Sequence, residues 1–241
     1  MNLEFLFPGG LGDTLTDYTE AWEQQRAIHR EVAAGERPGT VLMVEHPPVF
    51  TAGKRTQPHE RPVDGTPVVD VDRGGKITWH GPGQLVTYPI VRLPEGVYVV
   101  DYVRRLEEAM IMTFTELGLS TGRITGRSGV WLSADDSGPE RKLAAIGVRV
   151  AAKTTMHGVA INVDPDMSWY DRIIPCGIAD AGTTSLAREL DRDITLSEVA
   201  HVFRPYLEEM LTFSPYTQSP PIGAAPDPAT TITYGLTVPA V

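Results

Sequence analysis

Hydrophobic residues in the first hundred positions form short runs and one helical repeat. Runs bounded by glycine or proline predict strands at 3–7, 40–46, 67–73, 76–80 and 83–93. Residues 13–35 instead place their apolar side chains near one face at helical spacing, and these residues are Leu15, Tyr18, Trp22, Ile28 and Val32. This part of the chain therefore predicts several strands and one helix.

The following hundred residues repeat the same two patterns. Apolar residues recur every three or four positions from Val99 to Leu117, which predicts an amphipathic helix that ends at Gly118. Strand composition returns at 129–133, 142–150 and 157–164, and the last two runs predict a hairpin. A capping box at Thr195 and Glu198 starts a final helix. We therefore expect an α+β fold, in which a mixed β-sheet packs with α-helices.

The pattern changes after Phe213. Residues 214–241 carry six of the twenty prolines and show no amphipathic period. We therefore predict one folded catalytic domain at 1–213 and a proline-rich tail at 214–241. The tail is expected to be mobile or draped over the surface and to contribute little to the core.

Composition narrows the classes of protein to consider. With 241 residues and 41% hydrophobic content, the chain is long enough to bury a sizeable core. A formal charge of −10 argues against a general nucleic-acid binder, because neutralising phosphates requires a basic face. The absence of an apolar run of about 18 residues predicts no transmembrane helix, and the start MNLEFLFPGG lacks secretory features. We expect a cytoplasmic protein without a membrane association.

The only cysteine, Cys176, lies between Pro175 and Gly177. Proline fixes its own φ and glycine lets the backbone turn sharply, so this sequence is typical of a loop. A free cysteine is often a small buried hydrophobe, but a loop setting is equally compatible with a nucleophile. A reactive thiol needs a neighbouring base or cation, and the candidates are His80, His157 and Lys142.

A second chemistry-bearing stretch, RGGKITWHGPGQLVTYPI at 73–90, contains four glycines in its first eleven residues. Glycines let backbone amides approach a ligand closely, although two tight turns around a short strand would need them as well. The spacing fits neither a P-loop nor a Rossmann fingerprint. His80 within it is compatible with a structural role or a catalytic one. Spacing typical of a zinc site is absent, and we expect no metal.

Lys142 opens the otherwise apolar run KLAAIGVRV. A lysine at this place either extends toward water or points into a pocket. In a pocket, desolvation would lower the pKa of its ammonium group and make the amine usable as a base. The sequence leaves both orientations open.

Taken in order, five blocks resemble a known family, and they are EHPPVFTAGKRT, RGGKITWHGPGQLVTYPI, KLAAIGVRV, TTMHGVAINV and IIPCGIADAGTTSL. Together they are similar to the lipoyl (octanoyl) transferases of lipoate biosynthesis, relatives of the biotin and lipoate protein ligases. The resemblance covers roughly residues 3–213 and excludes the tail. It implies the mixed sheet and helices of the biotin and lipoate ligase catalytic domain.

The resemblance also implies a reaction. Members of the family move an octanoyl group from octanoyl-acyl carrier protein to a lysine of a lipoyl domain, through a thioester on the enzyme. The expected acceptors are the lipoyl domains of 2-oxoacid dehydrogenase complexes and the glycine cleavage H protein. On this interpretation Cys176 is the nucleophile and Lys142 is the general base and acid, in a monomer that needs no metal and no ATP.

Seven further residues are expected to bind substrate. They lie within the blocks that carry the resemblance, and they are Arg73, Gly75, Lys76, His80, Gly147, His157 and Gly158. Two rival functions remain open from the sequence. The first is an ATP-dependent lipoate or biotin ligase of the same fold, which would form an acyl-adenylate. The second is a noncatalytic module that binds lipoyl domains or acyl carrier protein.

Overall fold

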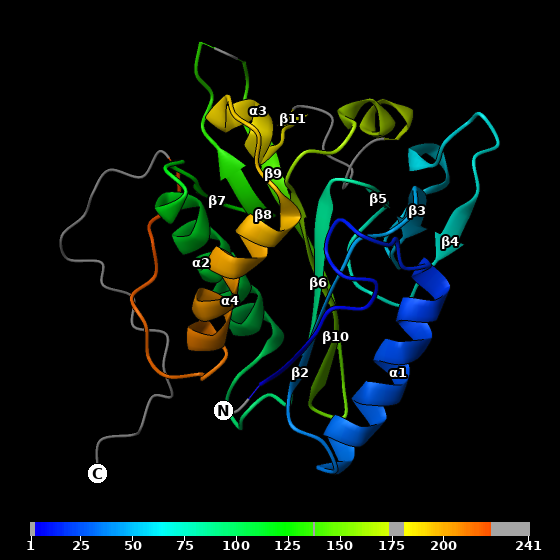
Figure 1. Cartoon of the computed structure of the whole chain (residues 1–241), viewed down its shortest axis with the longest axis vertical. Helices are drawn as coiled ribbons and strands as arrows, with labels where there is room; N and C mark the ends of the chain where they lie inside the picture. Colours follow the sequence, from blue (N-terminus) through cyan, green and yellow to red (C-terminus); the bar gives the residue numbers. More distant parts are fainter. Residues whose placement is uncertain (1–2, 137, 174–180, 223–241) are drawn as a thin grey trace.

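The structure is a computed structural model that describes residues 3–136, 138–173 and 181–222. Its centre is a mixed sheet whose strands lie in the order β1-β2-β6-β10-β9-β8-β7, with β11 paired to β9 (Figure 1). These strands are β1 (Glu4–Leu6), β2 (Thr40–Val44), β6 (Gln84–Ile90), β7 (Gly122–Ile124), β8 (Arg127–Leu132), β9 (Arg141–Ala151), β10 (Thr154–Asn162) and β11 (Gly182–Thr183). Most neighbours run antiparallel, but β1–β2 and β9–β11 are parallel. The α+β expectation is confirmed.

A smaller sheet lies beside the main one, with the order β4-β3-β5. Its strands are β3 (Val49–Ala52), β4 (Val68–Asp70) and β5 (Thr78–His80). The 3₁₀ helix η2 (Met167–Arg172) packs against β5, and Phe50, Trp79 and Tyr170 form the local core there. This small sheet carries the glycine-rich stretch that follows β4.

Helices cover both faces of the main sheet (Figure 1). The helix α1 (Tyr18–Ala34) packs on one face, where Ala21, Ile28 and Val32 meet strands β2 and β6. The helices α2 (Val99–Glu116) and α4 (Leu196–Met210) pack together on the opposite face, over the larger core. The main sheet is therefore the middle layer of three.

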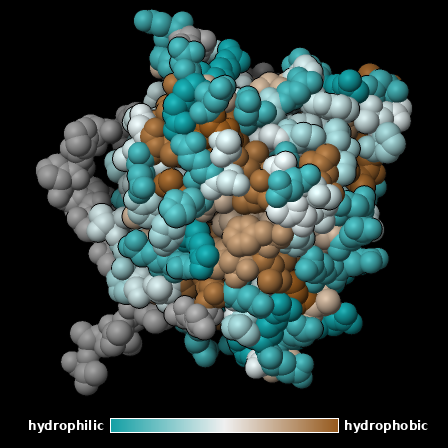
Figure 2. Space-filling model, viewed as in Figure 1, coloured by the Kyte–Doolittle hydropathy of each residue, from teal (hydrophilic) through white to brown (hydrophobic). Residues whose placement is uncertain are grey.

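Two short helical segments complete the fold. The helix α3 (Leu186–Leu190) follows β11, and the 3₁₀ helix η1 (Pro58–Glu60) lies between β3 and β4. Among the described residues no helix is both long and apolar enough to span a bilayer. Figure 2 shows that hydrophobic residues gather over the middle of the viewed face, between more polar surfaces.

Local chemistry explains where the predicted elements begin and end. The first helix starts at Tyr18 rather than near residue 13, because the Asp17 carboxylate accepts hydrogen bonds from the Thr19 and Glu20 amides. Thr195 caps α4 through its hydroxyl as predicted. The other half of the predicted capping box is different, since Glu198 forms an ion pair with Arg192.

The β9–β10 hairpin is confirmed and turns at Ala152 and Lys153, which both have positive φ. Two successive left-handed residues suit the twist of a two-residue hairpin. Of the predicted tail, residues 214–222 lie against the domain, since Arg105 donates to the Ser214 carbonyl and the Ile222 amide donates to the Arg123 carbonyl. The remaining residues, 223–241, fall outside the described ranges, and the domain boundary at 213/214 stays a prediction.

Candidate active site

A cavity of about 250 Å³ lies on the α1 face of the main sheet, between β5, β6, β8, β9 and β10. Eight of the nine sequence-predicted site residues line it, and they are Arg73, Gly75, Lys76, His80, Lys142, Gly147, His157 and Gly158. They come from three stretches of the chain, 73–80, 142–147 and 157–158. The structure therefore brings them into one place, whereas their individual roles stay predictions.

Arg73 shapes one rim of the cavity. Its guanidinium donates to the Gly74 and Lys76 carbonyls at 3.0 and 2.8 Å, and to both oxygens of Thr51 at 2.8 and 3.0 Å. A single buried side chain thus satisfies several carbonyls of the glycine-rich loop and ties them to β3. These bonds make Arg73 chiefly the residue that holds the loop, with its charge beside the cavity.

Lys76 is held as well. Its ammonium group forms an ion pair with Glu60 on η1, and the carboxylate of Glu60 also accepts the Gln57 amide at 2.8 Å. Burial opposes ionisation of Glu60, yet these bonds outweigh it and lower the pKa of the carboxyl group. A substrate group that used Lys76 would therefore share it with Glu60.

His80 on β5 is buried and neutral. Its Nδ1 lies 3.1 Å from the Gln84 side-chain oxygen, and the Gln84 amide group donates to Asn162 and Tyr170. Burial, reinforced by the charges of His46 and Arg73, lowers the pKa of His80 to about 3. With the proton on Nδ1, the ring keeps Nε2 as a hydrogen-bond acceptor.

Sequence reasoning missed two aromatic neighbours of His80. The ring of Tyr18 stacks on His80 at 5.9 Å between centroids, and the edge of His46 meets it at 6.0 Å. His46 itself donates from Nδ1 to the Thr16 carbonyl, and its Nε2 accepts from the Tyr88 hydroxyl at 2.8 Å. Burial lowers the pKa of His46 to about 4. The sequence feature that could have identified His46 is the block EHPP, in which the histidine stands at the end of the predicted strand 40–46.

His157 lies inside β10 with φ of 59°, a left-handed conformation that is uncommon for a residue with a side chain. Its Nε2 lies 2.7 Å from Asp72, and Asp72 also forms an ion pair with Arg149. Burial lowers the pKa of His157 to about 4, although Asp72 pulls it in the opposite direction. Asp72 therefore orients a neutral ring at the cavity wall, and no local sequence pattern indicated this role.

Gly147 and Gly158 face each other across the β9–β10 pair. A Cβ at position 158 would stand 2.1 Å from the Thr87 carbonyl oxygen, and one at position 147 would stand 2.8 Å from the Arg73 side chain. Both positions therefore require glycine because the neighbouring chain approaches too closely for a methyl group. Their absent side chains leave room for the Arg73 loop over the sheet.

Lys142 lies on β9 and is only 6% exposed. Its Nζ stands 4.6 Å from the centre of the Trp131 ring, a cation–π arrangement. Among the described residues no hydrogen bond or ion pair reaches this ammonium group, and the face of the Trp131 ring is its defined neighbour. Of the two orientations that the sequence left open for Lys142, the structure has the one in which the side chain lines the cavity.

Cys176 lies outside the described residues, within 174–180. The described residues on either side of that segment contact β5 and β9, which both border the cavity. Ile173 packs with Trp79 and Tyr170 next to His80, and β11 pairs with β9 so that Thr183 faces Lys142 in register. The Thr184 amide donates to the Lys142 carbonyl at 3.0 Å. The described residues on either side of 174–180 thus contact β5 and β9, two strands that carry the cavity-lining residues His80 and Lys142.

The chemistry available at the cavity is that of neutral imidazoles, one buried amine and an apolar wall. Val86, Ala145, Ile146, Val159 and Ala160 supply the apolar part. Within the described residues no group of three or more histidine, cysteine, aspartate or glutamate side chains is arranged to hold a metal ion. Such a site suits an acyl chain beside an amine that can exchange a proton.

The family profile described as the lipoyl protein ligase A/B catalytic domain matches residues 17–208. Curated relatives carry the name octanoyltransferase. The protein from Cutibacterium acnes is 54% identical over 236 residues, which cover 95% of this chain and 87% of that one. The protein from Mycolicibacterium smegmatis is 62% identical over 184 residues, which cover 76% and 80% of the two chains.

Solved structures share the fold at low sequence identity. A bi-partite lipoate protein ligase from Thermoplasma acidophilum has a TM-score of 0.67 and 16% identity, covering 88% of this chain and 83% of that one. A lipoate-protein ligase A bound with ATP has a TM-score of 0.64 and 14% identity, covering 88% and 85%. At such identities the likeness concerns the fold alone.

Proposed function

This chain belongs to the lipoyl protein ligase A/B catalytic-domain family and is an acyltransferase of its octanoyltransferase branch, and on that premise we propose a two-step transfer through Cys176. The donor is the octanoyl thioester of an acyl carrier protein, and the acceptor is a lysine of a lipoyl domain. Lys142 moves the proton in both steps. The observation that carries the proposal is the buried Lys142 amine, which lines the cavity on the strand that β11, the first strand after Cys176, pairs with.

The first step exchanges one thioester for another. Lys142 takes the proton of the Cys176 thiol, and the thiolate attacks the octanoyl carbonyl carbon. The carbon–sulfur bond to the carrier breaks, and the departing carrier thiolate receives the proton from the Lys142 ammonium group. Because the two thioesters are nearly equal in energy, orientation and thiolate formation decide the rate of this step.

The second step forms an amide. The ammonium group of the acceptor lysine must first lose a proton, and the neutral Lys142 amine left by the first step can accept it. The acceptor nitrogen then attacks the Cys176 thioester and the carbon–sulfur bond breaks. Lys142 returns its proton to the Cys176 sulfur, and the surplus proton of the new amide nitrogen leaves to solvent. Backbone amides of the glycine-rich loop are candidates for stabilising the oxyanion.

The remaining predicted residues divide by their contacts. Gly75 and the paired glycines 147 and 158 line the cavity proposed for the octanoyl chain, and the two paired glycines let Arg73 and the Thr87 carbonyl approach the sheet closely. Arg73 and Lys76 shape the rim and hold it through hydrogen bonds and an ion pair. The neutral rings of His80 and His157 line the wall and donate or accept hydrogen bonds without carrying charge. All seven remain substrate-binding proposals.

The rival within the same fold is a ligase that consumes ATP. A lipoate-protein ligase A of this fold was solved with ATP bound, and such a reaction would proceed through an acyl-adenylate without a cysteine. The two routes differ in the acyl donor. Only the thioester route forms a covalent acyl-enzyme from a carrier thioester in the absence of nucleotide.

The decisive experiment is intact mass spectrometry of the full chain mixed with octanoyl carrier protein, with and without ATP. We expect an octanoyl adduct on Cys176 without ATP, which disappears when a lipoyl domain is added. Cys176→Ser is expected to lower turnover by about three orders of magnitude, as nucleophile removal does. Full transfer activity by an enzyme whose Cys176 never becomes acylated would contradict the proposal.

The setting of the reaction is part of the same proposal. We expect a cytoplasmic monomer that serves lipoyl domains of 2-oxoacid dehydrogenase complexes and the glycine cleavage H protein. Sedimentation of the purified chain with and without a lipoyl domain measures its oligomeric state and its binding of that domain. A stable homodimer whose dissociation abolishes transfer would contradict the monomer.

A further inference from the structure

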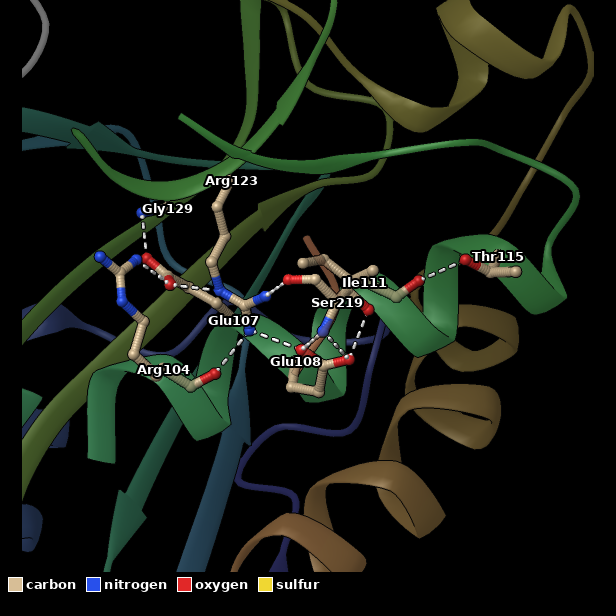
Figure 3. A network of polar contacts seen from close by, with 8 residues as sticks. All are labelled: Arg104, Glu107, Glu108, Ile111, Thr115, Arg123, Gly129 and Ser219. Carbon is tan, nitrogen blue, oxygen red and sulfur yellow. Dashed lines mark hydrogen bonds and ion pairs between the residues drawn. The ribbon is translucent and has the colours of Figure 1, made fainter. Parts of the chain in front are cut away.

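Behind the cavity, on the opposite face of the sheet, a group of charged side chains is buried between α2, β7 and the segment 214–222 (Figure 3). Its centre is Arg123, with the two neighbouring carboxylates of Glu107 and Glu108 on either side. All three are at most 3% exposed. Such groups are costly to bury unless each is paired, so their partners define what the group holds together.

Arg123 joins three parts of the chain. Its Nε donates to Glu107 at 2.9 Å, its Nη2 donates to Glu108 at 2.7 Å, and its Nη1 donates to the Ser219 carbonyl at 3.0 Å. Ser219 completes the contact by donating from its hydroxyl to Glu108 at 2.6 Å. The residues after the predicted domain boundary therefore pair directly with α2 and β7.

The backbone of the same segment extends this contact. Pro221 forms an isolated parallel β-bridge with Arg123, and the Ile222 amide donates to the Arg123 carbonyl at 2.7 Å. Earlier in the segment, the guanidinium of Arg105 donates to the Ser214 carbonyl and lies 4.7 Å from the centre of the Tyr216 ring. Ser214 to Ile222 is thus held by both side chains and backbone.

The other end of the charged group reaches the active-site wall. Glu107 uses its second oxygen, Oε1, to accept the Gly129 amide at 3.0 Å. Gly129 has φ of 106°, and a Cβ there would stand 2.4 Å from the Ala144 carbonyl oxygen and 3.5 Å from Cε of Lys142. At this point β8 therefore passes beside the side chain of Lys142, so that a side chain at position 129 would touch it.

The strand pairing gives a second reason for this link. The register between β8 and β9 shifts between Val130 and Trp131, directly after Gly129. Trp131 is the partner of Lys142 in that register and carries the ring over which its Nζ lies. A strand irregularity beside a functional side chain re-aims that side chain, and it needs support to keep its geometry. Glu107 is the described side chain that bonds the Gly129 amide at this irregularity.

We propose that Glu107, Arg123, Glu108 and Ser219 form a brace that positions β8 and, through Gly129 and Trp131, the side chain of Lys142. Residues 214–222 are then part of the catalytic domain's function rather than an appendage, and Glu107 and Ser219 are positioning residues. The consequence of this bracing for catalysis rests on the proposed role of Lys142 in proton transfer. The bracing itself can be measured without any substrate.

The test uses Ser219→Ala and Glu107→Gln in the full chain. Ser219→Ala removes one hydroxyl contact to Glu108, whereas Glu107→Gln removes the charge that faces Arg123 and Arg104 but keeps an acceptor oxygen. Matched controls on α4 are Ser197→Ala, at an exposed serine, and Glu208→Gln, in an exposed ion pair with Arg204. The controls repeat the same chemical changes away from the cavity.

Two readouts report position rather than stability. The first is hydrogen exchange of the Gly129 amide, followed by NMR at a temperature where each variant is fully folded. The second is the rate at which Lys142 is acetylated by trace acetic anhydride, relative to Lys54 and measured by peptide mass spectrometry. We expect Ser219→Ala to raise both several-fold and Glu107→Gln to raise both at least tenfold, with no change in the two controls.

The outcomes separate the two proposals. Unchanged Gly129 exchange and unchanged Lys142 acetylation in Ser219→Ala would overturn the brace, even if Glu107→Gln failed to fold. Increased exchange and acetylation with a lower kcat and an unaltered KM for the acceptor would support both proposals. Increased exchange and acetylation with full octanoyl transfer would support the brace and contradict the proposed role of Lys142.

Discussion

The cavity and the brace bury polar groups in opposite ways on the two faces of one sheet. At the cavity, burial keeps His46, His80 and His157 neutral by lowering their pKa values. In the brace, the buried groups are arginine and glutamate side chains, and each is matched by an opposite charge or a backbone partner. The neutral rings at the cavity can offer a hydrogen bond to a ligand, whereas the charges of the brace are already occupied by one another.

The comparison predicts that the two regions fail differently. Changes in the brace should cost stability because they leave a charge buried without its partner. Changes in the cavity should cost activity, because its histidines and its lysine are supported by few bonds within the protein. The following variants test this difference, beginning with the largest expected effect.

Arg123→Met is expected to have the largest effect on stability. It keeps most of the side-chain volume but leaves Glu107 and Glu108 buried beside each other, which should lower the free energy of unfolding by about 3–5 kcal/mol. Urea denaturation measures the change. Arg204→Met is the control, since an exposed pair with Glu208 is worth about 0–1 kcal/mol. Equal losses in the two variants would remove the distinction between the brace and the surface.

Lys142→Ala is expected to have the largest effect on activity. Loss of a general acid and base should lower octanoyl transfer by a factor of about 10²–10⁴ while the protein stays folded. Lys142→Arg should fail as well, because a guanidinium does not release its proton at usable pH. Single-turnover transfer to a lipoyl domain, with circular dichroism beside it, measures both. An active Lys142→Arg enzyme would make His80 or His157 the next candidate.

The buried histidines predict how stability depends on pH. In the unfolded chain a histidine has a pKa near 6.5, whereas His46 in the folded protein has one of about 4. Below about pH 6.5 the unfolded chain therefore binds protons that the folded chain does not, so stability is present above that pH and is lost as the pH falls toward 4. Between pH 7.5 and 5 the loss should be about 2 kcal/mol for each such histidine.

Denaturation at a series of pH values measures this slope. His46→Gln should reduce the slope between pH 5 and 6 by about one proton, since one group that titrates only in the unfolded chain is gone. His201→Gln, at an exposed position on α4, is the control for the same change of residue type. If both variants keep the wild-type slope, His46 is not held neutral by burial.

Ser219→Ala should have the smallest effect on stability, about 1 kcal/mol, because one hydrogen bond to a charged group is lost while the Ser219 amide still donates to Glu108. The thermal midpoint of unfolding measures this cost. Thr212→Ala is a nearby control whose hydroxyl donates at an exposed position. A midpoint for Ser219→Ala equal to that of wild type would show that the hydroxyl is not part of the stabilising contact.

The sequence predicted the long elements and eight of the residues that line the cavity. Hydrophobic period predicted the helix that became α2, and two runs of strand composition predicted the β9–β10 hairpin, since both patterns depend on neighbours within a few residues. The chemistry-bearing blocks also identified residues that line one cavity, from His80 to His157. Such residues stand out because glycine, proline and histidine are unusual beside strands.

The tertiary structure decided everything that depends on a partner distant in the chain. Asp72 orients His157 from 85 residues away, and Ser219 meets Glu108 from 111 residues away. Neither contact leaves a local pattern, because an isolated aspartate or serine is ordinary in a loop. The proline-rich composition of 214–222 suggested a segment with no place in the core, yet carbonyl and hydroxyl groups need no apolar period to satisfy buried charges. Only the folded chain brings the donors and acceptors together and thereby makes those residues structural.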